Sequence, residues 1–204
     1  MTTLPAPADA IAESQRLIAA LEQRRAELPF ADDMLATHRT MHRELEMSHT
    51  TSQQAVAEWR AALARRWECE VAGRKLYKQV MRQLVDYYGS PEAAPVTLVS
   101  RGGAEAESSP SELLEDLRRL HAALLIEDAP PFAEQRRAEV TQAHRDLEAA
   151  IAHANACEHR RRTAVLDSRM VREVYRRVRS ETYRALVGHY GQAVPPVFEG
   201  LLDG

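Results

Sequence analysis

Apolar residues recur along most of the chain at the spacing of an α-helix. Around Leu45, apolar or weakly polar side chains fall on or near one face when each residue is turned by the 100° of a helix. That face holds Met34, His38, Met41, Leu45, His49, Ser52 and Val56. Ala, Leu, Glu and Arg, which are strong helix formers, dominate the composition. The pattern therefore predicts long amphipathic helices.

Turn and cap residues divide the first half of the chain into a short helix and a very long one. The short helix is expected to begin near Asp9, a suitable N-cap, and to run toward Glu27. Pro29 then ends it and begins the long helix, because proline is tolerated in a first helical turn. The long helix is expected to continue to Tyr88, with Gly89 as its left-handed C-cap.

The second half repeats this order. Ser111 or Ser109 is expected to cap a short helix that runs toward Glu127, and a second long helix is expected to end at Tyr190 before Gly191. Two places in the first long helix are weak enough for a break. One is the low-propensity run at 48–52, and the other is Gly73, near which the apolar face changes phase.

The two halves are similar in sequence as well as in pattern. A shift of 102 residues places 29–89 on 131–191 without a gap, and a shift of 103 aligns the short helices upstream. The matches include Pro29-Phe30-Ala31 with Pro131-Phe132-Ala133, His42-Arg43-Glu44-Leu45-Glu46 with His144-Arg145-Asp146-Leu147-Glu148, and Tyr88-Gly89 with Tyr190-Gly191. A collinear series that shares its turns indicates an internal duplication.

These observations predict an all-α fold, an elongated antiparallel bundle of the four-helix or coiled-coil type. It would consist of two tandem short-helix/long-helix hairpins, 9–89 and 111–191, related by a pseudo-twofold axis. Residues 90–110 are expected to be a flexible linker and 192–204 a tail, with the alternative that the apolar stretches of both fold back as caps.

The short helices reach only the first third of each long helix, so apolar residues beyond that point need another partner. They are Trp59, Leu63, Trp67, Leu76, Val165, Val171 and Val178. We expect the other long helix to cover them, or else a second copy of the chain.

The sequence favours a cytoplasmic protein, and its composition is typical of a bacterial one. No secretory signal or apolar span of about 18 residues is visible. Cys69 and Cys157 lack metal-ligand spacing and are expected to be reduced, partly buried residues. We expect no cofactor and no catalytic activity, since the chain contains no Gly-rich phosphate loop and no nucleophile elbow.

A His/Glu set is the candidate metal site. His42 and Glu46 stand one helical turn apart, and the pair recurs as His144 and Glu148. Imidazole and carboxylate groups on facing helices can share a transition metal. Against this, Ile151 replaces His49 in the second copy, and the first short helix has no histidine. The alternative is that His42 and Glu46 form a surface pair while His38 and His49 fill semi-polar core positions.

Positive charge is concentrated in the distal half of each long helix. Residues 58–82 carry a net charge of +4 and residues 158–184 one of +5, although the whole chain has −3. The candidate contact residues are Trp59, Arg60, Trp67, Arg74, Lys75 and Arg82 in the first copy and Arg162, Arg176, Arg177 and Arg184 in the second. Such helices could bind nucleic acid, an anionic membrane or an acidic protein, or could be neutralised by the protein's own acidic segments.

Taken together, the sequence favours a non-enzymatic helical scaffold or interaction protein with a protein partner or a second copy of itself. A metal-binding bundle and a binder of an anionic partner are the alternatives.

Overall fold

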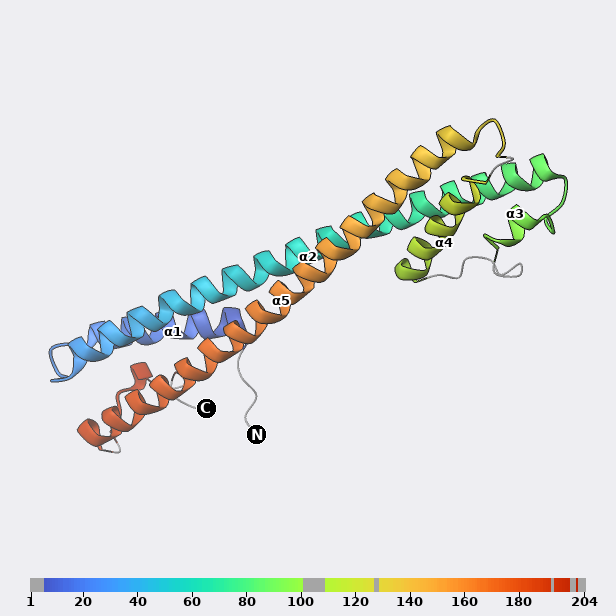
Figure 1. Ribbon diagram of the computed structural model, residues 1–204. Helices are drawn as coiled ribbons and strands as arrows, with labels where there is room; N and C mark the ends of the chain where they lie inside the picture. The colour runs from blue at the N-terminus through green and yellow to red at the C-terminus, as the bar shows by residue number, and fades with distance from the viewer. Residues whose placement is uncertain (1–5, 101–108, 127–128, 192, 199–200, 202–204) are drawn as a thin grey trace. The chain divides into compact units, whose positions relative to one another are not determined.

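The computed structural model describes residues 6–100, 109–126, 129–191, 193–198 and 201 (Figure 1). The helices are α1 (Pro7–Gln23), α2 (Ala31–Tyr88), α3 (Ala94–Thr97), α4 (Pro110–Ala123) and α5 (Ala133–Tyr190), followed by the 3₁₀ helix η1 (Pro196–Phe198). Strands are absent from the described part of the chain. The predicted all-α class is confirmed.

The helix ends follow the predicted signals closely for the long helices and less closely for the short ones. Gly89 and Gly191 adopt positive φ angles of 71° and 67°, and their N–H groups donate to carbonyls four residues earlier at 2.9 and 2.8 Å. Only glycine adopts this conformation without steric cost, so each ends its helix. Ser109, not Ser111, caps α4 and forms a capping box with Glu112.

The prediction for the start of α1 was wrong by two residues. The helix begins at Pro7, Ala6 occupies the N-cap, and Asp9 lies in the first turn. The ends of α1 and α4 come four residues before the predicted ones, because turns at Arg24 and Leu124 redirect the chain. The residue before a proline avoids the helical region of backbone φ and ψ angles, so the turn that follows α1 cannot continue as helix into Pro29.

Neither candidate break interrupts α2, which is helical through residues 48–52 and through Gly73. The Ser48 hydroxyl donates to the Leu45 carbonyl at 3.1 Å, so a polar residue in this run is satisfied within the helix. A side chain at position 73 would lie 3.4 and 3.5 Å from atoms of Leu113 and Leu117. Gly73 therefore gives the α4 leucines room to approach the helix.

The chain packs as two compact units whose boundaries differ from those of the sequence repeats. The first unit comprises residues 1–57 and 159–204, and the second comprises residues 58–158. Each unit thus contains part of α2 and part of α5.

In the first unit, α1 and η1 cover the paired segments of α2 and α5. Phe30 contacts His189 edge to face, and farther along α2 the His38 imidazole is bonded to Thr182. Because the α2 numbers rise as the α5 numbers fall, these segments are antiparallel. Phe198 and Leu201 are buried with the α1 leucines in one cluster, so the tail does fold back as a cap.

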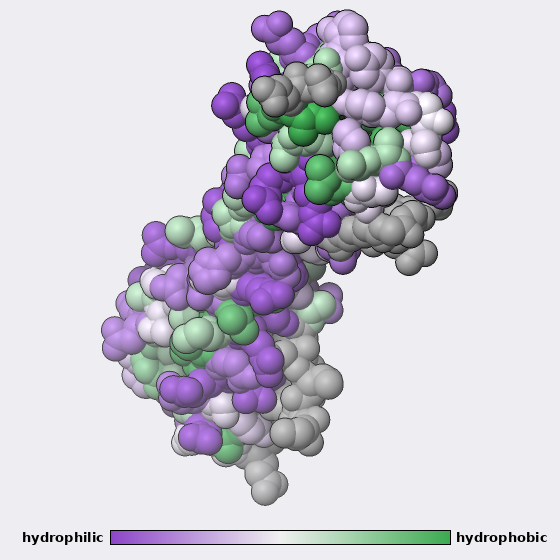
Figure 2. Space-filling model, turned by 45° about the vertical axis from the view of Figure 1, so that its right-hand side comes forward, coloured by the Kyte–Doolittle hydropathy of each residue, from purple (hydrophilic) through white to green (hydrophobic). Residues whose placement is uncertain are grey.

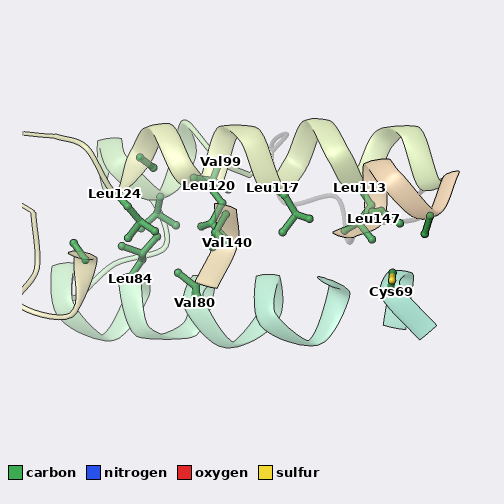
Figure 3. Packing of buried hydrophobic residues seen from close by; sticks show 14 residues of the cluster. Cys69, Val80, Leu84, Val99, Leu113, Leu117, Leu120, Leu124, Val140 and Leu147 are labelled. Atoms are coloured by element: carbon green, nitrogen blue, oxygen red, sulfur yellow. The ribbon is translucent and has the colours of Figure 1, made fainter. Parts of the chain in front are cut away.

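In the second unit, α4 packs on the other segments of α2 and α5. Figure 3 shows leucine and valine side chains from these helices pointing into one cluster. Val96 and Val99 are fully buried in the same cluster, at and just after α3. This part therefore folds back on the core as a cap, as expected for its apolar stretch, and is not the flexible linker that was the other expectation; residues 101–108 lie outside the described part.

At corresponding positions of the two repeats, a large side chain in one unit replaces a small one in the other. In the second unit Gly73 faces Leu113 and Leu117 of α4. In the first unit the position 102 residues after Gly73 is Tyr175, which is buried in a cluster with Ala10 and close to Ser14 of α1. In the first unit a large residue of α5 thus packs beside small residues of α1. In the second unit the sizes are reversed, because glycine of α2 faces leucines of α4.

Helix packing covers only some of the apolar residues that were expected to need a partner. Trp59 and Leu63 pack against Ala62, Ala154 and Cys157, which confirms their expected burial by the other long helix. Val171 and Val178 are partly buried in the first unit, and Leu76 in the second.

For Trp67 and Val165 the expected cover by the other long helix is wrong, since both side chains are exposed; burial against a second copy stays a prediction.

Candidate functional site: an aromatic and basic face of α2

The four candidate metal ligands fall into two pairs in different units. In the first unit His42 Nε2 lies 3.4 Å from a carboxylate oxygen of Glu46. His144 and Glu148 both belong to the second unit, where they line a hollow between α4 and α5. Among the described residues, no group of three or more His, Cys, Asp or Glu side chains is placed to hold a metal ion. Metal binding by these four residues stays a hypothesis, and the described residues do not bring the four side chains together at one site.

We expect protein purified without a tag to contain much less than one equivalent of iron, zinc or manganese. The reason is that two ligands per pair leave most of a transition metal's coordination positions unfilled. Elemental analysis of the wild type beside His42→Ala and His144→Ala measures this. A stoichiometric metal that either substitution removes would restore the metal-binding hypothesis.

The basic candidates of the second repeat belong to the first unit, where acidic neighbours accompany them. Arg176 pairs with Glu173 at 2.8 Å. Arg177 and Arg184 are exposed. Glu173 precedes Arg177 by one helical turn, and Glu181 lies between the two arginines, about one turn from each. This strip therefore presents mixed charge.

The basic candidates of the first repeat form a more uniform surface on α2 in the second unit. Arg74, Lys75, Lys78, Gln79, Arg82 and Gln83 line an open hollow of about 610 Å³. Arg74 lies 3.7 Å from Glu70. Within the described residues, no carboxylate is within ion-pair distance of Lys75, Lys78 or Arg82. These three cations are therefore open to an external anion.

Apolar side chains continue this surface toward the N-terminal side of the hollow. Trp67 is 64% exposed and Val71 is 45% exposed. Together with Lys75, Lys78 and Arg82 they follow one side of α2 at spacings of four, four, three and four residues. We call these five residues the α2 contact face. The face in view in Figure 2 likewise shows hydrophobic residues standing within a largely hydrophilic surface.

The remaining candidates differ in their availability. Trp59 is half-buried against Ala62, Ala154 and Cys157, so it supports the helix pairing more than it offers a surface. Arg60 is exposed, about two helical turns before Trp67. Sequence reasoning missed Val71 and Lys78, although their spacing from Trp67 and Lys75 is readable; the two tryptophans could be told apart only by packing.

A second concentration of polar groups lies inside the first unit and has no access to solvent. The Thr182 hydroxyl donates to the Val178 carbonyl at 3.0 Å, so it accepts from the His38 imidazole at 2.8 Å. Burial lowers the pKa of His38 to about 4 and raises that of the Tyr175 phenol. The expected placement of His38 in the core is confirmed, and its burial argues for a structural role.

In the described part of the chain, no helix combines the length and apolar character that a membrane span requires. A scan against protein-family models, a search of curated proteins and a search of solved structures each found no match to this chain.

Proposed function

We propose that this protein is a non-enzymatic, cytoplasmic helical scaffold that binds an acidic protein partner through the α2 contact face. The observation that carries the proposal is the continuity of exposed Trp67 and Val71 with three cations that have no carboxylate partner among the described residues. Trp and Arg supply most of the energy at protein interfaces, and complementary charge sets the rate and specificity of association.

A protein partner fits this face better than nucleic acid does. Two apolar side chains occupy one end of the face, where they would be desolvated by apolar groups of a protein. The chain as a whole carries a net charge of −3, which opposes binding of a long polyanion. Cys69 and Cys157 are both buried and not joined in a disulfide, which is consistent with a reducing compartment.

We further propose that the chain consists of two duplicated short-helix/long-helix hairpins with pseudo-twofold symmetry. Three observations support this. The bounds of α2 and α5 differ by 102 residues at both ends. Both long helices end at a left-handed glycine. Where Gly73 of one long helix is replaced by Tyr175 in the other, the leucines of α4 that face Gly73 are replaced by small residues of α1.

A photo-crosslinking amino acid at position 67 is expected to capture an acidic protein from extract of the native host. The same group at Met47 should capture none, although Met47 is exposed to a similar degree, at 69%. Raising the salt from 0.1 to 1 M should weaken capture, because the Debye length falls from about 10 to about 3 Å.

Charge reversal provides the matched control. Lys75→Glu/Arg82→Glu should abolish capture at unchanged helical content, whereas Arg177→Glu/Arg184→Glu, at the corresponding positions of the second repeat, should leave it intact. Equal loss in both variants would contradict a specific α2 face. Salt-sensitive binding to duplex DNA, single-stranded RNA or anionic vesicles, with no protein captured, would replace the protein partner by that anion.

Self-association is the second candidate use of an exposed helix side. Leu166, Met170 and Val174 are exposed on α5 at spacings of four residues, within the first unit. This apolar stripe favours a second copy over an acidic partner. Sedimentation velocity of the wild type and Met170→Glu tests it: a concentration-dependent dimer that the substitution abolishes supports the candidate, and a wild-type monomer at high concentration excludes it.

A further inference from the structure

The second unit contains a hollow of about 310 Å³ between α4 and α5. Its floor is mostly apolar, and Leu117 and Val140 lie beneath that surface, both fully buried in the core. Partly buried His121 of α4 and His144 of α5 line it from opposite helices, and exposed Arg145 stands at its edge. An apolar hollow with a few convergent polar groups is the usual form of a small-molecule site.

The charges around the hollow are unequally engaged. Arg118 also lines it, but its guanidinium donates two hydrogen bonds to Glu115, at 2.8 and 2.9 Å. These bonds lower the pKa of Glu115 to about 2. By contrast, no described carboxylate is within ion-pair distance of Arg145. Arg145 is thus the cation that remains available to a ligand.

Comparison with the corresponding positions of the first unit shows what is particular to this hollow. There His42 pairs with Glu46 at 3.4 Å. The equivalent His144 and Glu148 are not within bonding distance of each other, and no described residue bonds to the His144 ring. His121 occupies the position of Ile18, so the second unit has one more hydrogen-bonding ring at this place.

We propose that this hollow binds a small organic anion. The apolar body of the ligand lies on the apolar surface of the hollow, above Leu117 and Val140, and its carboxylate or phosphate group accepts hydrogen bonds from Arg145, His121 and His144. The apolar floor excludes a fully hydrated inorganic ion, and the unengaged arginine supplies the charge that a neutral ligand would not need. Glu148 also lines the hollow, and its carboxylate disfavours ligands that carry a second anionic group apart from the one bound by Arg145.

Titration of the full chain with hexanoate and phenyl phosphate tests the proposal, with ring ¹⁵N signals of labelled histidines as the readout. Both probes should shift the His121 and His144 signals saturably, with hexanol and inorganic phosphate as the apolar-only and anion-only controls. Arg145→Gln should weaken binding about tenfold, the effect of one charge-assisted hydrogen bond. Arg43→Gln, the equivalent change in the first unit, should leave the affinity within about twofold, which is the ordinary scatter of a surface substitution.

A second variant, His121→Ile, installs the residue of the first unit and should also weaken both probes. Hexanol binding as tightly as hexanoate would overturn the anion site, as would equal effects of Arg145→Gln and Arg43→Gln. So would a failure of either probe to shift the two histidines at 10 mM, a concentration well above the millimolar Kd of a minimal site. Zinc chloride shifting them at one equivalent, with no response to the anions, would replace the anion by a metal. The site is independent of the α2 contact face, and Lys75→Glu/Arg82→Glu should leave probe binding unchanged.

Discussion

Tyr175→Gly is expected to destabilise the protein by about 4–6 kcal/mol. Truncating a buried aromatic side chain to alanine costs about 3–5 kcal/mol, and glycine in a helix interior adds about 1 kcal/mol. Tyr175 is 1% exposed, and its ring contacts His38 edge to face with centroids 6.4 Å apart. Urea unfolding followed by circular dichroism, with the midpoint and the slope both determined, measures the loss.

The exchange of residue sizes between the units makes this prediction specific. Adding Ala10→Leu and Ser14→Leu to Tyr175→Gly reproduces the combination of Gly73 with Leu113 and Leu117, so it should recover at least half of the lost stability. The same two leucines beside the native Tyr175 should cost about 1–3 kcal/mol through overpacking. If the leucines are equally harmful with and without Tyr175, the two units do not use interchangeable packing.

Acidification from pH 7.5 to 5 is expected to remove about 2 kcal/mol of stability through His38 alone. Its pKa is about 4 in the folded protein and about 6.5 in the unfolded chain. The unfolded chain therefore binds the proton first as the pH falls, so stability is full above pH 6.5 and is lost between 6.5 and 4. Below pH 4 the loss is complete, at about 3 kcal/mol.

The groups near His38 do not alter this sign. Thr182 and the phenol of Tyr175 stay neutral across the window, because burial raises the pKa of the phenol. The buried ion pair of Glu13 with Arg179 completes the polar interior of the first unit. Within the described residues the Nδ1 atom of His38 has no hydrogen-bond partner, so only the bond from Nε2 to Thr182 offsets the burial of the imidazole.

The double variant His38→Val/Thr182→Val isolates the effect. It installs the residues found at the corresponding positions of the second unit, Val140 and Val80, both fully buried in one cluster (Figure 3). The variant should fold at pH 7.5 and lose the extra destabilisation of about 2 kcal/mol on going to pH 5. An unchanged pH dependence in urea melts would show that other groups control acid stability.

The sequence was sufficient for the helices because their signals are local. Gly89, Gly191 and Ser109 act through hydrogen bonds to residues at most four positions away, so their effects can be read from neighbouring letters. Where the prediction failed, a distant contact decided the outcome. Val96 and Val99 sit in a segment rich in Pro, Gly and Ser, yet both are buried by helices elsewhere in the sequence.

The candidate sites were predictable in kind but not in detail. Charge clustering identifies the basic half of α2, and the four-residue spacing of Glu70 and Arg74 predicts that pair, but only the folded chain shows that Lys75 and Lys78 have no carboxylate nearby among the described residues. His144 was identified by its repeat with His42. His121, which lines the same hollow, comes from another helix, and no spacing within one helix could place the two residues at one site.

The most direct test of the proposed function uses the two tryptophans of the chain, Trp59 and Trp67. In protein labelled with 5-fluorotryptophan, extract of the native host at low salt should broaden or shift the ¹⁹F signal of exposed Trp67, and added salt should restore it. The half-buried Trp59 serves as the internal control and should not change. A partner that binds while the Trp67 signal stays constant, or that affects Trp59 instead, would contradict binding through the α2 contact face.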